Sequence, residues 1–174
     1  MKRDLSLWQL SGFALTSLAG TLLHFLYDWT RQSIGSALIS AVNESTWEHI
    51  KLLYVPLFLF AVAQSFFFPE YKNFWCVKLI GTLFGLTLIP VLFYTYNGAI
   101  GPSPDWLNIA IFFIAAAAAL LLEWLLFRAA RPRRCLPRLC LGILIGMGIL
   151  FIVFTFWPPR LPLFQDPLDG SFGA

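Results

Sequence analysis

The sequence predicts an all-α integral membrane protein with five transmembrane helices, and three observations support this fold class. Hydrophobic residues make up 59% of the 174 residues and charged residues only 12%, about half the charged share of soluble domains. Five apolar runs are each long enough to cross a bilayer core, which takes roughly 20 helical residues. Lys, Arg and Trp gather near the ends of these runs, as they do at membrane surfaces. The runs leave no room for a soluble domain, so we expect one transmembrane domain over residues 1–174.

The predicted spans cover about residues 5–27, 50–69, 74–96, 105–127 and 139–157. The first span follows a basic start like that of a signal peptide, but it ends in polar residues without a cleavage site, so we expect it to stay in the protein. Pro56 and Pro90 fall inside the second and third spans, where each should kink its helix. Ala115 to Ala119 gives the fourth span a smooth packing strip. Gly142 and Gly146 give the fifth span a small-residue face, which either packs inside the bundle or forms a homodimer.

The segment between the first two spans predicts a short additional helix. Residues 31–43 carry apolar residues at helical spacing opposite a polar face. The apolar positions are Ile34, Ala37, Leu38, Ala41 and Val42, and the polar ones are Gln32, Ser33 and Ser36. We expect this helix to lie on the outer membrane surface or to dip into it as a re-entrant segment.

The distribution of basic residues predicts the orientation, because cytoplasmic loops are enriched in Lys and Arg. Nine of the twelve fall on one side of the predicted spans: Lys2, Arg3, Lys72, Lys78, Arg128, Arg131, Arg133, Arg134 and Arg138. The other three are Arg31, Lys51 and Arg160. We therefore expect a multi-pass protein of the cell membrane with its N-terminus in the cytoplasm and its C-terminus outside. Glu123, close to the inner end of the fourth span, should pair with Arg128 or extend to the surface.

Three cysteines, Cys76, Cys135 and Cys140, fall on the predicted cytoplasmic side. Thiols normally stay reduced there, so we expect no disulfide. No further Cys or His accompanies the pair Cys135 and Cys140, which argues against a zinc site at this place.

The densest polar stretch runs from Asn43 to Lys51, at the start of the second span. Ser45 and Glu48 have the spacing of a capping box, in which each side chain satisfies a free backbone N–H of the other. Glu48 and Lys51 are three residues apart and can form an ion pair. Together with Glu44 and His49 they exceed what one helix cap needs. Ionisable groups at membrane depth tend to face a wet cavity and to find partners.

Two further segments supply polar groups on the same outer side. His24 and Asp28 are four residues apart on one helical face, where the carboxylate can orient the imidazole for base chemistry or metal binding. The alternative is a structural hydrogen bond between helices. Near the C-terminus, Asp166-Pro167 and Asp169-Gly170 are turn signals. They predict a tail that folds back with Asp166 over the bundle mouth, or else a solvated terminus.

The chain resembles a family of small bacterial integral membrane proteins of unknown function. The resemblance rests on the motif Asn-Glu-Ser-x-Trp-Glu-His-x-Lys at residues 43–51 and on the upstream His24. It also includes a terminal pattern at Asp166, Pro167, Gly170, Phe172 and Gly173. The chain departs from that pattern at Asp169, where a hydroxyl residue is expected, and at Phe172, where tyrosine is expected. The resemblance supports the grouping of these residues and implies no reaction.

These groups predict an enzyme whose site lies in the extracytoplasmic leaflet and acts on a lipid, a lipoprotein or a lipid-linked intermediate. The candidate catalytic residues are His24, Asp28, Glu48 and His49, supported by Asn43, Glu44, Trp47, Lys51 and Asp166. His24, His49 and Glu44 are the candidate ligands of a divalent metal such as zinc, because two imidazoles and a carboxylate can form a catalytic zinc site. The alternatives are an ion or small-solute transporter and an accessory membrane subunit without catalysis. Nothing in the composition implies a nucleic-acid partner.

Overall fold

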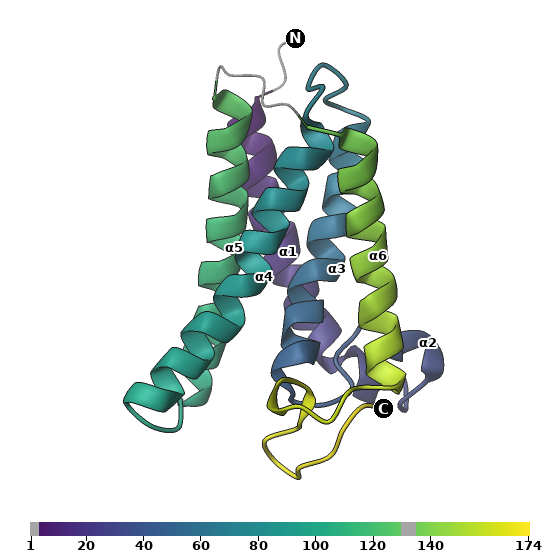
Figure 1. Cartoon of the computed structure of the whole chain (residues 1–174), viewed down its shortest axis with the longest axis vertical. Coiled ribbons are helices and arrows are strands. Elements are labelled where there is room, and N and C mark those ends of the chain that lie inside the picture. The colour runs from purple at the N-terminus through teal and green to yellow at the C-terminus, as the bar shows by residue number, and fades with distance from the viewer. Residues whose placement is uncertain (1–3, 130–134) are drawn as a thin grey trace.

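The computed structural model describes residues 4–129 and 135–174 (Figure 1). These residues form helices only, apart from an isolated bridge between Gln165 and Phe172. Five helices are long and apolar enough to cross a membrane: α1 (Leu5–Trp29), α3 (Thr46–Ser65), α4 (Phe74–Ala99), α5 (Asp105–Arg128) and α6 (Pro137–Phe156). Two short elements accompany them, α2 (Ile34–Ala37) and the 3-10 turn η1 (Pro162–Phe164). The prediction of five apolar helices is confirmed.

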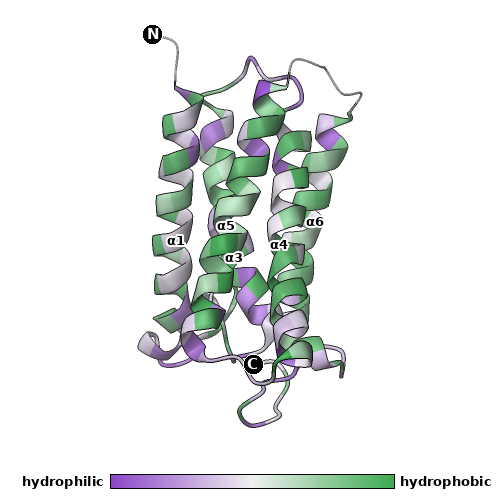
Figure 2. Ribbon diagram, turned by 90° about the vertical axis from the view of Figure 1, so that its left-hand side faces the viewer, coloured by the Kyte–Doolittle hydropathy of each residue, from purple (hydrophilic) through white to green (hydrophobic). Residues whose placement is uncertain are grey.

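The bundle has two distinct ends. The first helix ends and α3 begins at the end that also holds α2 and the C-terminus, which we call the C-terminal end (Figure 1). Hydrophobic residues cover the long helices, and hydrophilic residues concentrate toward the two ends (Figure 2). The basic residues Lys2, Arg3, Arg131, Arg133 and Arg134 lie outside the described residues. The orientation of the bundle in a membrane therefore stays a prediction.

Small residues set the closest helix packing. A Cβ added at Gly85 of α4 would lie 2.8 Å from Ala119 Cβ and 3.1 Å from the Ala115 carbonyl oxygen. The predicted alanine strip on α5 therefore packs directly against α4, as small residues allow in membrane bundles. At the C-terminal end α4 and α5 lean away together from α3 and α6 (Figure 1).

The glycines of α6 behave differently. A Cβ at Gly142 or Gly146 would meet no other atom of the described chain within 4 Å. Of the two expectations for this face, internal packing is therefore wrong, and the homodimer stays a prediction.

The short α2 differs from the expected helix over residues 31–43. Ile34 is exposed, whereas Ser36 is buried. The Ser36 hydroxyl lies 2.6 Å from the Thr30 hydroxyl and donates to the Ser33 carbonyl at 2.8 Å. Local hydroxyl hydrogen bonds compete with helix propagation, which explains why the helix stops after one turn.

Glu123 has a different partner from the one expected. It is only 1% exposed, and its Oε2 lies 2.5 Å from Lys78 Nζ and accepts a 3.1 Å hydrogen bond from Gln9 Nε2. The Arg128 guanidinium instead lies over the ring of Trp124. The expectations that Glu123 pairs with Arg128 or extends to the surface are both wrong. Its partner Lys78 is on another helix, and no local spacing in the sequence reveals that contact.

The expectation of no disulfide is also wrong. Cys76 on the first turn of α4 is bonded to Cys135, with the two Cα atoms 6.4 Å apart. The expectation depended on the redox state of a compartment, whereas the bond depends on α4 and α6 beginning side by side at the same end of the bundle.

Candidate metal-binding site

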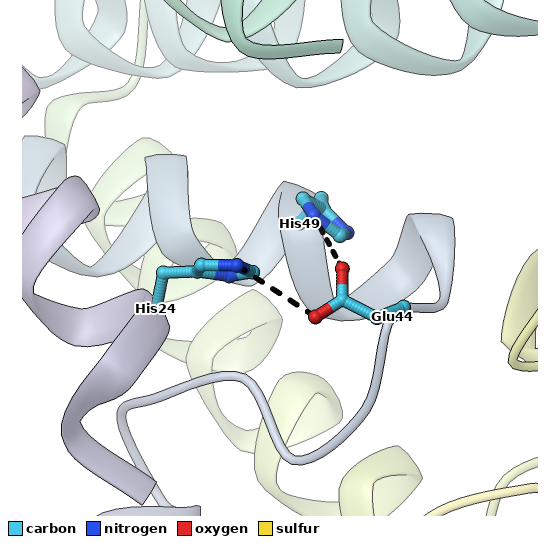
Figure 3. Close-up of side chains that lie close together, drawn as sticks. All are labelled: His24, Glu44 and His49. Carbon is cyan, nitrogen blue, oxygen red and sulfur yellow. Dashed lines mark ion pairs between the residues drawn. The ribbon is translucent and has the colours of Figure 1, made fainter. Parts of the chain in front are cut away.

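Two histidines and a glutamate converge at the C-terminal end of the bundle (Figure 3). His24 comes from the last part of α1, Glu44 from the loop before α3, and His49 from the first turn of α3. One ligand atom from each residue lies within 4.8 Å of the others. Glu44 Oε1 is 3.6 Å from His24 Nε2, and Glu44 Oε2 is 3.5 Å from His49 Nε2. The three side chains are 29%, 42% and 31% exposed in chain order, so solvent reaches them.

The tautomer of His49 follows from its other ring nitrogen. His49 Nδ1 lies 2.9 Å from the backbone carbonyl oxygen of Ser45. A carbonyl only accepts, so Nδ1 carries a proton and donates it. In the neutral ring Nε2 then presents a lone pair toward the Glu44 carboxylate. Two acceptors facing one another need a proton or a cation between them.

The three residues fit a divalent cation. Metal-binding imidazoles usually donate their second N–H to a carbonyl or carboxylate, as His49 does to Ser45. A tetrahedral ion with bonds near 2.0 to 2.2 Å separates two ligand atoms by about 3.4 Å. Each His–Glu distance is close to this value, although the two run to different oxygens of the carboxylate. The second nitrogen of His24, Nδ1, is buried without a hydrogen-bond partner among the described residues. Among the described residues no hydrogen bond or ion pair joins Asp28 to His24, whereas Glu44 forms an ion pair with it.

The loop that carries Glu44 is held by hydrogen bonds to the C-terminal segment after α6. The Glu44 N–H donates to Asp166 Oδ2 at 2.9 Å. The Asn43 amide donates to the Gly173 carbonyl at 3.2 Å, while Asn43 Oδ1 accepts from the Ser45 N–H at 3.0 Å. The prediction that the tail folds back is therefore confirmed. Asp166 acts on the site through the backbone of Glu44 and does not join the histidine cluster.

The tail keeps its shape through local turns. Asp166 Oδ1 accepts from the Leu168 N–H at 2.7 Å, and Gly170 adopts a φ of 78°, a region that glycine enters without cost. The Ser171 N–H donates to Asp169 Oδ1 at 2.8 Å, which holds the pKa of this carboxyl below its ordinary value. A hydroxyl at residue 169, which the family resemblance implies, would supply an equivalent acceptor.

Glu48 and Lys51 lie in a separate, buried network. Glu48 Oε2 is 2.5 Å from Lys51 Nζ, which confirms the predicted pair. Lys51 also donates to the Ala37 carbonyl at 3.0 Å and to the Thr155 hydroxyl at 2.8 Å, and that hydroxyl donates to Glu48 Oε1 at 3.0 Å. The network joins α2, α3 and α6. Thr155 was missed from sequence, although a lone hydroxyl between Phe154 and Phe156 is a signal that could have indicated it.

The capping box is confirmed only in part. Ser45 Oγ accepts from the Glu48 N–H at 3.4 Å, as predicted. The Glu48 carboxylate does not return to the Ser45 N–H and accepts instead from the Val42 N–H at 3.3 Å. The Ser45 N–H donates to Asn43 Oδ1 instead.

Trp47 supports the tail and lies apart from the histidines. Its ring packs against Phe151 and Phe154 of α6 and against Phe164 of η1, with centroid separations of 4.6, 5.5 and 4.8 Å. It therefore fixes the start of the tail against α3 and α6.

The described residues form a bundle of five helices that are long and apolar enough to cross a membrane, with two imidazoles and a carboxylate close together at one end. The chain belongs to a family of unknown function, DUF6512, which matches residues 1–174. This confirms the resemblance to an uncharacterised family that the motifs indicated. Comparisons with curated proteins and with solved structures found no match.

Proposed function

We propose that this protein is a membrane enzyme that binds a divalent metal, such as zinc, through His24, Glu44 and His49. The observation that carries the proposal is the position of His49. Its Nδ1 donates to the Ser45 carbonyl, so its Nε2 lone pair faces Glu44 Oε2. The other oxygen of this carboxylate, Oε1, faces His24 Nε2. A cation satisfies all three groups at once.

Three protein ligands leave a fourth tetrahedral position for water, the arrangement of catalytic zinc sites. A bound divalent ion would polarise a carbonyl or phosphoryl oxygen and make water a nucleophile near neutral pH. Asp28, exposed about one turn further along α1, is the carboxylate we assign to proton exchange with solvent. Glu48 and Lys51, enclosed in their own network, hold the loop and the start of α3 in place.

A lipid, a lipoprotein or a lipid-linked intermediate is the proposed substrate. The cluster lies where the apolar lengths of α1 and α3 end, so a headgroup at the membrane surface would be within its reach. An apolar groove of about 250 Å³ lies between α3, α4 and α6 and is lined in part by Trp47 and Ile50. It is separate from the cluster, because His49 faces His24 of α1.

We further propose that the C-terminal end of the bundle faces away from the cytoplasm and that α2 lies along the outer membrane surface. The excess of Lys and Arg near the opposite end supports this orientation. The exposed Trp29, Trp106 and Trp157 support a membrane surface at the C-terminal end, because tryptophan prefers either membrane–water boundary.

The test uses full-length protein purified without a histidine tag. We expect about one zinc ion per chain after equilibration and dialysis, and loss of that ion in His24→Ala, His49→Ala and Glu44→Gln. The matched control is Asp169→Asn, which changes an exposed carboxyl of the tail and should retain the metal. Metal that stays bound in all three variants would refute the site.

A cellular measurement tests the reaction. Cells in which His24→Ala or His49→Ala replaces the native protein should accumulate one lipid or lipoprotein species, the uncleaved substrate, at unchanged protein abundance. Unchanged lipids and lipoproteins would contradict the enzymatic role. Accumulation of an ion or small solute instead would favour transport.

A further inference from the structure

All three cysteines of the chain meet at the end of the bundle opposite to the histidine cluster. Cys76 is buried at 6% exposure on the first turn of α4 and is bonded to Cys135. The Cys140 thiol, on the first turn of α6, lies 3.0 Å from Cys76 Sγ and contacts it as a hydrogen-bond donor. Cys135 and Cys140 are both partly exposed. A buried sulfur therefore has two more accessible sulfurs within its reach.

A structural disulfide needs two cysteines, and here a third lies in contact with the bonded pair. The Cys140 thiol, on the first turn of α6, lies 3.0 Å from Cys76 Sγ. Disulfides exchange when a thiolate attacks one of the two bonded sulfurs, so Cys140 has the position of the attacking group.

We propose that Cys76, Cys135 and Cys140 form a thiol–disulfide exchange site in which Cys76 alternates between two partners. The Cys140 thiol gives its proton to solvent and the resulting thiolate attacks Cys76 Sγ, so that the Cys140–Cys76 bond forms and the Cys76–Cys135 bond breaks. The electron pair of the broken bond leaves on Cys135 as a thiolate, which then takes up a proton. The number of disulfides and the oxidation state are unchanged, so the step requires no external oxidant.

The exchange changes what α4 is attached to. With Cys135 as its partner, α4 is tied to the segment before α6, and with Cys140 it is tied to α6 itself. The second state releases the Cys135 thiol at the surface. Disulfides at cytoplasmic positions are usually transient and redox-sensing, which agrees with the proposed orientation of this end. The site shares no residue with the histidine cluster and does not depend on the proposed enzyme.

Thiol mapping of the full-length protein in detergent tests the exchange. Protein equilibrated in a glutathione redox buffer is blocked with iodoacetamide, digested without reduction and analysed by mass spectrometry. In the wild type we expect both the Cys76–Cys135 and the Cys76–Cys140 peptides, with Cys135 and Cys140 each partly alkylated and Cys76 protected. Complete alkylation of Cys140 together with the Cys76–Cys135 peptide alone would overturn the proposal.

Two serine variants provide the matched comparison. Cys135→Ser should form the Cys76–Cys140 bond in the same buffer, and Cys140→Ser should contain only the Cys76–Cys135 bond. Thermal unfolding in reductant verifies that both variants are folded. A folded Cys135→Ser protein with two free thiols would overturn the proposal. So would reduced wild-type protein in which one equivalent of zinc protects all three thiols, because that result indicates a thiolate metal site. The wild-type map decides the question even if a variant does not fold.

Discussion

At the residue scale, the candidate site depends on how Glu44 is held. Its two carboxylate oxygens face different imidazoles, so a small rotation of the loop would remove one contact or the other. Asp166 fixes the backbone of this residue from more than a hundred positions away in the sequence. Groups that position metal ligands contribute strongly to metal affinity even though they never touch the ion.

Replacing Asp166 tests this positioning. Asp166→Ala removes the acceptor of the Glu44 N–H and should weaken zinc binding by roughly 10- to 100-fold. Asp166→Asn keeps an acceptor oxygen and should retain affinity close to that of the wild type. Calorimetric titration of both variants measures the difference. Equal affinities for Ala and Asn would mean that the hydrogen bond does not position Glu44.

A second residue-scale prediction concerns the buried pair of Lys78 and Glu123, each 1% exposed. Lys78→Met leaves a carboxylate without its cation and should lower the free energy of unfolding by about 3 to 5 kcal/mol. Adding Glu123→Met removes the orphaned charge and should restore most of that loss, since Gln9 retains the Leu120 carbonyl as acceptor. Unfolding in mixed micelles measures both variants. A double variant no more stable than the single one would contradict this account of the pair.

Residue types were predictable from sequence, but long-range partners were not. The motif at residues 43–51 and the upstream His24 indicated which groups lie together, because costly ionisable residues cluster only for a reason. The contact between Asp166 and the Glu44 backbone, and the link from Lys51 to Thr155, depend on tertiary packing. No local spacing encodes them.

At the element scale, Gly85 allows α4 to pack closely against α5. Gly85→Ala would place a methyl group 2.8 Å from Ala119 Cβ and should destabilise the protein by about 1 to 3 kcal/mol. Gly98→Ala, on the same helix with no atom within 4 Å, is the matched control and should be neutral or slightly stabilising. Thermal unfolding of the two variants compares them. Similar melting temperatures would show that α4 and α5 do not pack this closely.

The long helices were predictable because apolar length alone defines them, and each lies within a few residues of its expected range. The second span begins at Thr46, earlier than expected, because Ser45 serves as its N-cap. It ends at Ser65, before the expected residue 69, and Pro69 lies just beyond. The segment after α1 was less predictable, since hydroxyl contacts among Thr30, Ser33 and Ser36 compete with the helical pattern.

At the scale of the whole molecule, the proposed orientation has a direct test. A reporter fused after Ala174 should be extracytoplasmic, because nine of the twelve basic residues favour the opposite side. A reporter that is active in the cytoplasm would show that the bundle has the opposite orientation in the membrane. The histidine cluster would then face the cytoplasm, which contradicts an extracytoplasmic substrate. The cysteines would face the outside, where the argument from transient cytoplasmic disulfides no longer applies.

The central claim is that His24, Glu44 and His49 bind a divalent metal, and zinc-edge X-ray absorption of the tag-free protein tests it most directly. The account predicts one shell of nitrogen and oxygen ligands at about 2.0 to 2.2 Å, with the outer scattering of two imidazoles. Both signals should disappear in His24→Ala and His49→Ala. Sulfur scattering at about 2.3 Å, or zinc retained without imidazole, would contradict it.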